Sequence, residues 1–144
     1  SPIEFINIIK QDRSKDRPPR WWYYFAVPDQ SVKSKPNQIE VRSIRKKTFP
    51  IFGKVQSIEW KHNNYSENLA NEFTQNTNIN SLAMDIGNVK IESINKDFSG
   101  YTFTGYTIEI ERKTWKDWGN NRKISLDNNQ WETINKIADL CKNS

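Results

Sequence analysis

The feature that most constrains the fold is the run Trp21–Val27, which holds five consecutive aromatic residues followed by Ala and Val. In a β-strand, successive side chains point to opposite faces of the sheet. The odd-numbered and even-numbered residues of this run would therefore lie on opposite faces, and both sets are bulky. We interpret the run as a central strand covered on both sides, and we expect the rings of Trp21–Phe25 to belong to the core.

The rest of the chain alternates between strand-like and helix-like patterns. The residues around Tyr101–Arg112 form the clearest long strand, and its apolar pattern changes face at Gly105, which predicts a bulge there. Apolar residues at helical spacing predict a helical segment at about 66–85, broken near Asn76, and a C-terminal helix at about 127–142 that Asp127 caps. The segment Ile3–Ile9 fits either a strand or a short helix.

The order of these elements favours an α+β fold. Neighbouring strands are joined by short turns, which favours antiparallel pairing. We predict a mostly antiparallel twisted sheet packed against the middle helical segment and the C-terminal helix. The 144 residues fit a single compact domain, 1–144, with one core. The chain starts at Ser1 without Met, which is compatible with excision from a longer protein.

Charge and cysteine content narrow the class of protein. The chain has 22 basic and 17 acidic residues, a net charge of +5 and a pI of about 9.3. This surplus favours an anionic partner, either an acidic protein or nucleic acid. We expect no membrane span, because no apolar run approaches the ~20 residues that cross a bilayer. The single cysteine, Cys141, excludes an internal disulfide and favours a cytoplasmic setting. The sequence leaves the oligomeric state open.

Most kinds of catalytic site are missing from the sequence. With one histidine and one cysteine, the chain cannot build a Cys/His zinc site of its own. It also has no glycine-rich phosphate-binding motif, so we expect no nucleotide cofactor or other cofactor. We expect no bound metal, except Mg²⁺ under the nuclease alternative described next. We expect His62 to be an exposed loop residue and Cys141 to be a buried, inert thiol.

One enzymatic pattern remains as an alternative. Glu111 and Lys113 share a face at the end of a predicted strand, and Asp85 or Asp97 lies upstream. An Asp followed by Glu-x-Lys resembles the signature of the PD-(D/E)xK nucleases. That resemblance implies acids that hold Mg²⁺ and a lysine that orients water or stabilises charge. An ordinary solvated strand face explains the same residues, so we expect a non-catalytic protein.

Basic residues interleave with aromatic ones in three clusters. The candidate binding residues are Arg17, Arg20, Arg45, Lys46, Lys47, Trp115, Lys116, Trp118, Arg122 and Lys123. Cations that meet phosphates and rings that stack bases are the chemistry of single-strand binding. Trp115 and Trp118 lie in a polar segment and are the first candidates for an exposed aromatic site.

The sequence thus predicts a non-catalytic basic binding or adaptor domain that contacts an acidic protein or nucleic acid through Arg, Lys and loop aromatics. Two alternatives remain: the Mg²⁺-dependent nuclease, and a structural or self-associating domain.

Overall fold

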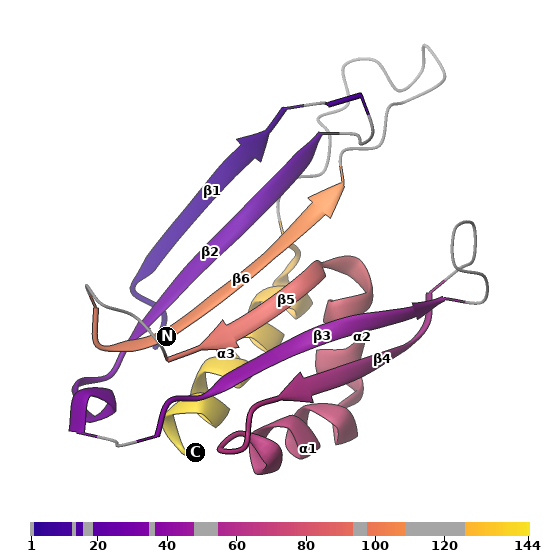
Figure 1. The fold of residues 1–144 in the computed structure, drawn as a ribbon. Coiled ribbons are helices and arrows are strands. Elements are labelled where there is room, and N and C mark those ends of the chain that lie inside the picture. The colour runs from indigo at the N-terminus through magenta and orange to yellow at the C-terminus, as the bar shows by residue number, and fades with distance from the viewer. Residues whose placement is uncertain are drawn as a thin grey trace.

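The computed structural model describes residues 2–12, 14–15, 19–34, 37–47, 55–93, 98–108 and 126–144. These residues form six strands, three α-helices and one 3₁₀ turn (Figure 1). In chain order the elements are β1 (Phe5–Gln11), β2 (Arg20–Pro28), η1 (Gln30–Ser34), β3 (Glu40–Lys47), β4 (Val55–His62), α1 (Glu67–Gln75), α2 (Thr77–Asp85), β5 (Gly87–Glu92), β6 (Gly100–Ile108) and α3 (Asn128–Lys142).

The six strands form one sheet in the order β1-β2-β6-β5-β3-β4. Every neighbouring pair in this order is antiparallel. The predicted antiparallel sheet with a middle helical segment and a C-terminal helix is therefore confirmed. The ambiguous segment Ile3–Ile9 contributes most of β1, so its β-branched residues decide in favour of a strand.

All three helices lie on one face of the sheet (Figure 1). The predicted break at Asn76 is confirmed, because its side chain accepts a hydrogen bond from the backbone N–H of Ile79 at 3.0 Å and caps α2. Asp127 caps α3 as predicted. Its carboxylate accepts from the backbone N–H of Gln130 at 2.8 Å, and the Gln130 side chain accepts from the backbone N–H of Asp127 at 3.0 Å.

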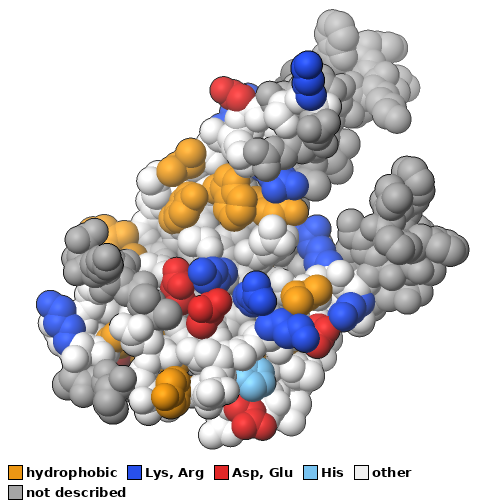
Figure 2. Space-filling model, viewed as in Figure 1, with side chains coloured by type: hydrophobic (Ala, Val, Ile, Leu, Met, Phe, Trp, Pro, Cys, Tyr) orange, Lys and Arg blue, Asp and Glu red, His pale blue; other side chains and the backbone are white. Residues whose placement is uncertain are grey.

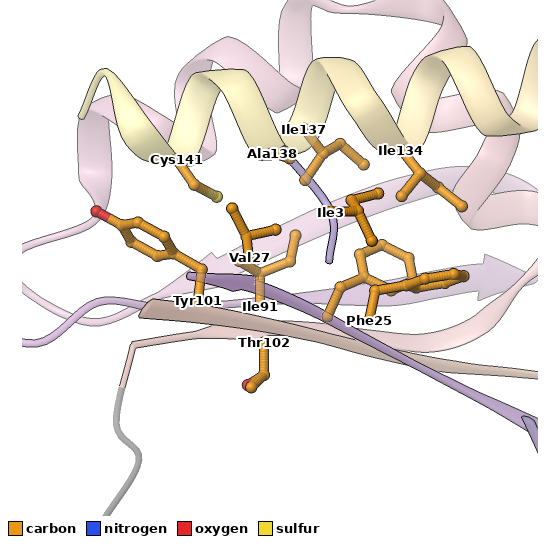
Figure 3. A pocket seen from close by; sticks show the side chains of 11 residues that line it. Ile3, Phe25, Val27, Ile91, Tyr101, Thr102, Ile134, Ile137, Ala138 and Cys141 are labelled. Atoms are coloured by element: carbon orange, nitrogen blue, oxygen red, sulfur yellow. The ribbon is translucent and has the colours of Figure 1, made fainter. Parts of the chain in front are cut away.

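The core fills the space between this helical layer and the sheet. The Phe25 ring meets the edges of the Phe103 and Trp131 rings, with centroids 5.4 and 5.5 Å apart. Figure 3 shows α3 packed over β2, with Ile134 and Cys141 facing the sheet. The gap left there is about 10 Å³, which is no more than one water molecule needs. Cys141 is buried, as the sequence predicted.

The opposite face of the sheet carries none of the described helices, and we call it the open face. Tyr23 and Phe25 belong to the core, but Trp22 and Tyr24 lie on the open face, and Tyr24 is 39% exposed. The prediction that Trp21–Phe25 is covered on both sides is therefore wrong for these two rings. An antiparallel sheet can leave one face to water, and the described elements make only two layers.

The bulge predicted at Gly105 lies instead on the neighbouring strand. β6 pairs with β2 in unbroken register, whereas the register against β5 shifts between Gly87 and Lys90. Asn88, within this shift, has a φ of 49°, a left-handed conformation that asparagine tolerates better than most residues. Gly105 is needed for a different reason, because a Cβ there would lie 2.4 Å from the Ile86 side chain.

Candidate functional site

One row of cross-strand neighbours crosses the open face through all six strands. From β1 to β4 its members are Asn7, Tyr24, Thr104, Lys90, Arg42 and Lys61. Neighbouring strands lie about 4.8 Å apart, so the last three residues form a line of cations about 10 Å long. We call Lys90, Arg42 and Lys61 the cation row. Figure 2 shows blue Lys and Arg side chains gathered over this part of the sheet.

This arrangement is electrostatically unfavourable in the free protein. Like charges directly opposite each other on neighbouring strands destabilise a sheet. The two outer cations have acidic partners: Lys90 Nζ lies 3.2 Å from Glu92 and Lys61 Nζ lies 3.0 Å from Glu59. Arg42, between them, is exposed and has no ion-pair partner among the described residues. A bound anion would relieve the repulsion that remains.

Glu59 holds two lysines at the β4 edge of this face. Its carboxylate lies 2.8 Å from Lys46 Nζ as well as 3.0 Å from Lys61 Nζ. The hydrogen bond from Lys46, followed by that from Lys61, lowers the pKa of Glu59 from 4.5 to about 2. Glu59 is therefore ionised at neutral pH, and Lys46, a predicted binding residue, is paired with it.

An aromatic cluster lies next to the cation row. The Arg20 guanidinium lies over the Tyr106 ring, 4.3 Å from its centroid, and the Trp22 ring lies 5.1 Å from the same centroid. Trp22 Nε1 donates to the Gln11 side chain at 3.0 Å, which fixes the indole. Gly87 leaves room for this cluster, since a Cβ there would lie 2.7 Å from Tyr106 Cζ. The buried Nε of Arg20 makes no hydrogen bond within the described residues.

A hollow of about 300 Å³ opens where β1, β2 and β6 meet, and we call it the apolar hollow. Most of the surface that lines the hollow is apolar. The lining residues are Phe5, Ile6, Asn7, Tyr24, Phe25, Ala26, Thr102, Phe103 and Thr104. Ala26 lies between Phe5 and Thr102, its partners on β1 and β6, and its small side chain leaves the depression. Thr104 joins the hollow to the cation row, because it also pairs with Lys90.

The described residues differ in net charge between the helical layer and the rest of the structure. Residues 66–86 and 127–144, which carry the three helices, contain six acidic and two basic residues, a net charge of −4. The other residues that the structure describes contain ten basic and six acidic residues, a net charge of +4. This separation favours anion binding on the sheet side and disfavours it on the helix side.

The structure brings two of the candidate residues predicted from the sequence to one ring. Arg20 and Arg45 lie 4.3 and 5.9 Å from the centroid of the Tyr106 ring, and Arg45 also donates from Nε to the Ala83 carbonyl of α2 at 3.3 Å. Lys47 is the last residue of β3. Six further candidates lie outside the described residues: Arg17, Trp115, Lys116, Trp118, Arg122 and Lys123. The predicted set omitted Arg42, Lys61 and Lys90, which only strand pairing brings together.

Only one of the four residues of the nuclease alternative lies in the described part of the chain. Asp85 is at the end of α2, on the helical layer, where its carboxylate accepts from Gln130 Nε2 at 3.3 Å. Asp97, Glu111 and Lys113 lie outside the described residues. Among the residues described, no group of three or more His, Cys, Asp or Glu could hold a metal ion. His62 is exposed, as predicted, but it is the last residue of β4 and not a loop residue.

No protein-family model, curated protein or solved structure matches this chain. Within the described ranges, the helices are all too short or too polar to cross a membrane.

Proposed function

We propose that the protein is a non-catalytic binding domain that holds an anionic partner on its open face, against the cation row. The observation that carries this proposal is the position of Arg42, flanked on both neighbouring strands by lysines and paired with no acid in the described structure. Three cations in a line about 10 Å long suit a partner with repeated negative charges. Both nucleic acid and an acidic protein segment have this property.

The charge distribution supports the same proposal. Among the described residues, a polymer with repeated anions that approaches the sheet side meets a net positive charge, and the acidic helical layer lies on the other face of the sheet. Such a partner releases its bound counterions when it meets lysines and arginines, so its affinity depends strongly on salt.

The test compares two triple variants that remove the same number of charges. Arg42→Gln, Lys61→Gln and Lys90→Gln together remove the cation row. Lys33→Gln, Lys136→Gln and Lys142→Gln remove three charges from η1 and α3 and serve as the control. Each protein is titrated with a single-stranded oligonucleotide and with polyglutamate at several salt concentrations.

We expect binding by the wild-type protein to weaken as salt rises. For a single-stranded nucleic acid, each phosphate contact contributes about 0.7 to the slope of log K against log salt. Loss of the cation row should therefore reduce the steepness of this salt dependence by about 2, three times the contribution of one contact. The control should leave the steepness unchanged. If both triple variants lost the same affinity, binding would depend on the net charge of the protein and not on the cation row. No binding to either polymer at low salt would overturn the proposal.

The same titration with Mg²⁺ tests the nuclease alternative. Cleavage of the oligonucleotide that requires Mg²⁺ and disappears in Glu111→Gln would replace the non-catalytic proposal. Intact oligonucleotide at every Mg²⁺ concentration would leave the protein as a binder.

Self-association is a second candidate function, favoured by the exposed edge strand β1. Its side chains Phe5, Ile6, Ile8 and Ile9 are 60, 51, 42 and 47% exposed. An apolar strand at the edge of a sheet is a template for pairing with another strand, here β1 of a second copy. The other edge, β4, carries charges instead.

Sedimentation over a range of protein concentrations tests this second candidate. We expect a dimer that Ile8→Lys dissociates, because the new charge would lie in the middle of the edge strand. A wild-type monomer at the highest concentration would exclude pairing through β1.

A further inference from the structure

The apolar hollow lies on the same row of residues as the cation row. Tyr24 pairs with Thr104 and Thr104 with Lys90, so Tyr24 and Lys90 are two strands apart, about 10 Å between Cα atoms. One extended ligand can therefore contact the hollow and the cations together. Figure 2 shows the hydrophobic side chains over β1 and β2 beside the blue cations.

The hollow offers ring faces to a ligand. Phe5 and Tyr24 are 60 and 39% exposed although both are aromatic, and both line the hollow. The floor at Ala26 is small enough for a flat group to lie against these rings. The aromatic cluster of Trp22 and Tyr106 is less accessible, because Arg20 covers Tyr106, which is only 9% exposed.

Polar groups at the rim suit a ligand that is flat but not wholly apolar. Asn7 and Thr104 flank Tyr24 in the row, one on each side. Neither side chain makes a hydrogen bond to any other residue in the described part of the chain. An amide and a hydroxyl beside an aromatic ring can bind the polar edge of a heterocycle that stacks on that ring.

Other cavities suit an anionic ligand less well. A larger one, about 470 Å³, lies between η1, α1 and the last residues of the chain. Among the described residues that line it, the only charged side chain is that of Glu72, which repels anions. The gap beneath α3 is too small for a ligand.

From these observations we propose that the anionic partner is a single-stranded nucleic acid, with one unstacked base in the apolar hollow against Tyr24 and its backbone phosphates on the cation row. This inference rests on the proposed function and adds the class of partner. Stacking on exposed aromatic residues beside a basic groove is how single strands bind without a sequence requirement. The bases of a duplex are already stacked and paired, so a duplex would reach only the cations.

The experiment separates the contribution of the base from that of the phosphates. The probes are a single-stranded DNA oligomer, an abasic oligomer of the same length, which has the same charge and no bases, and polyglutamate. The variants are Tyr24→Ala, which removes the ring, Tyr24→Phe, which keeps it, and Ala26→Leu, which fills the hollow from a partly exposed position.

We expect the wild-type protein to bind the base-bearing oligomer more tightly than the abasic one. Tyr24→Ala and Ala26→Leu should weaken binding of the base-bearing oligomer roughly five- to a hundredfold, the effect of losing one base–aromatic stack. Binding of the abasic oligomer should not change. That unchanged binding would show that both variants are folded, and Tyr24→Phe should behave as wild type because it keeps the ring.

Three other outcomes overturn the inference in distinguishable ways. Equal, salt-dependent binding of both oligomers would mean that no base binds in the hollow. The proposed function would then still hold. Binding of polyglutamate but of neither oligomer would assign the face to an acidic protein. Failure of all three polymers to bind at low salt would overturn the proposed function as well.

Discussion

Replacing Arg42 by Gln should stabilise the free protein, although it removes a side chain from the middle of the sheet. Arg42 lies opposite Lys90 on one side and opposite Lys61 on the other, and both are cations. The outer cations have acidic partners and Arg42 has none in the described structure. The substitution therefore removes two repulsive pairs and breaks no ion pair.

The magnitude follows from these two pairs. A cross-strand pair of charged side chains typically changes stability by about 0.2–1 kcal/mol. Both pairs lie on an exposed face, where water reduces the effect, so we take the lower part of that range for each. The free energy of unfolding should rise by about 0.5–1 kcal/mol in low salt. Gln retains part of the aliphatic stem of Arg, which limits the loss of packing.

Urea denaturation at two salt concentrations measures this effect. The Debye length falls from about 30 Å at 0.01 M to about 3 Å at 1 M salt, so the gain in stability should largely disappear at 1 M. Lys136→Gln on α3, outside the cation row, is the control and should change little. If Arg42→Gln destabilises the protein equally at both salt concentrations, the repulsion argument is wrong, and Arg42 acts through packing.

The remaining predictions concern single groups. The Glu59 carboxyl should titrate by NMR with a pKa of about 2, and because this lies below its usual 4.5, the stability it contributes is present above pH 4.5 and is lost as the pH falls toward 2. In Glu59→Gln, the free energy of unfolding should therefore fall less between pH 4.5 and pH 2 than it does in the wild-type protein. Gly105→Ala should lower the free energy of unfolding by about 1–3 kcal/mol in urea, because its Cβ would meet the Ile86 side chain at 2.4 Å. Asp127→Ala should cost about 1 kcal/mol, measured by thermal unfolding, because α3 loses its capping box.

The positions of helices and strands were easier to predict from the sequence than the exposure of their side chains. The break at Asn76 and the cap at Asp127 depend on local hydrogen bonds, so residue types were enough to locate them. The exposure of Trp22 and Tyr24 depends on how many layers the chain forms, which no local pattern reports. Both residues combine a large apolar surface with a polar group, so they are compatible with a core and with an open face.

The cation row was not predictable from the sequence for a different reason. Arg42 and Lys90 are 48 positions apart and become neighbours only because β5 lies between β6 and β3. The basic residues that are close together in the sequence, Arg42, Arg45 and Lys46, are divided by strand alternation. Arg42 and Lys46 lie on the open face, whereas Arg45 reaches the carbonyl of Ala83 on α2.

The acids beside the cation row connect stability with affinity. Glu59 and Glu92 reduce repulsion among the cations of the free protein, and they compete with a bound anion for the same lysines. Glu59→Gln should therefore tighten binding of a polyanion while it destabilises the free protein, and Arg42→Gln should do the reverse. Variants of this face should then show opposite changes in affinity and in stability. Substitutions of residues that only support the fold would lower affinity and stability together. Whether the two quantities change in opposite directions or in the same direction therefore distinguishes a binding face from an ordinary charged surface.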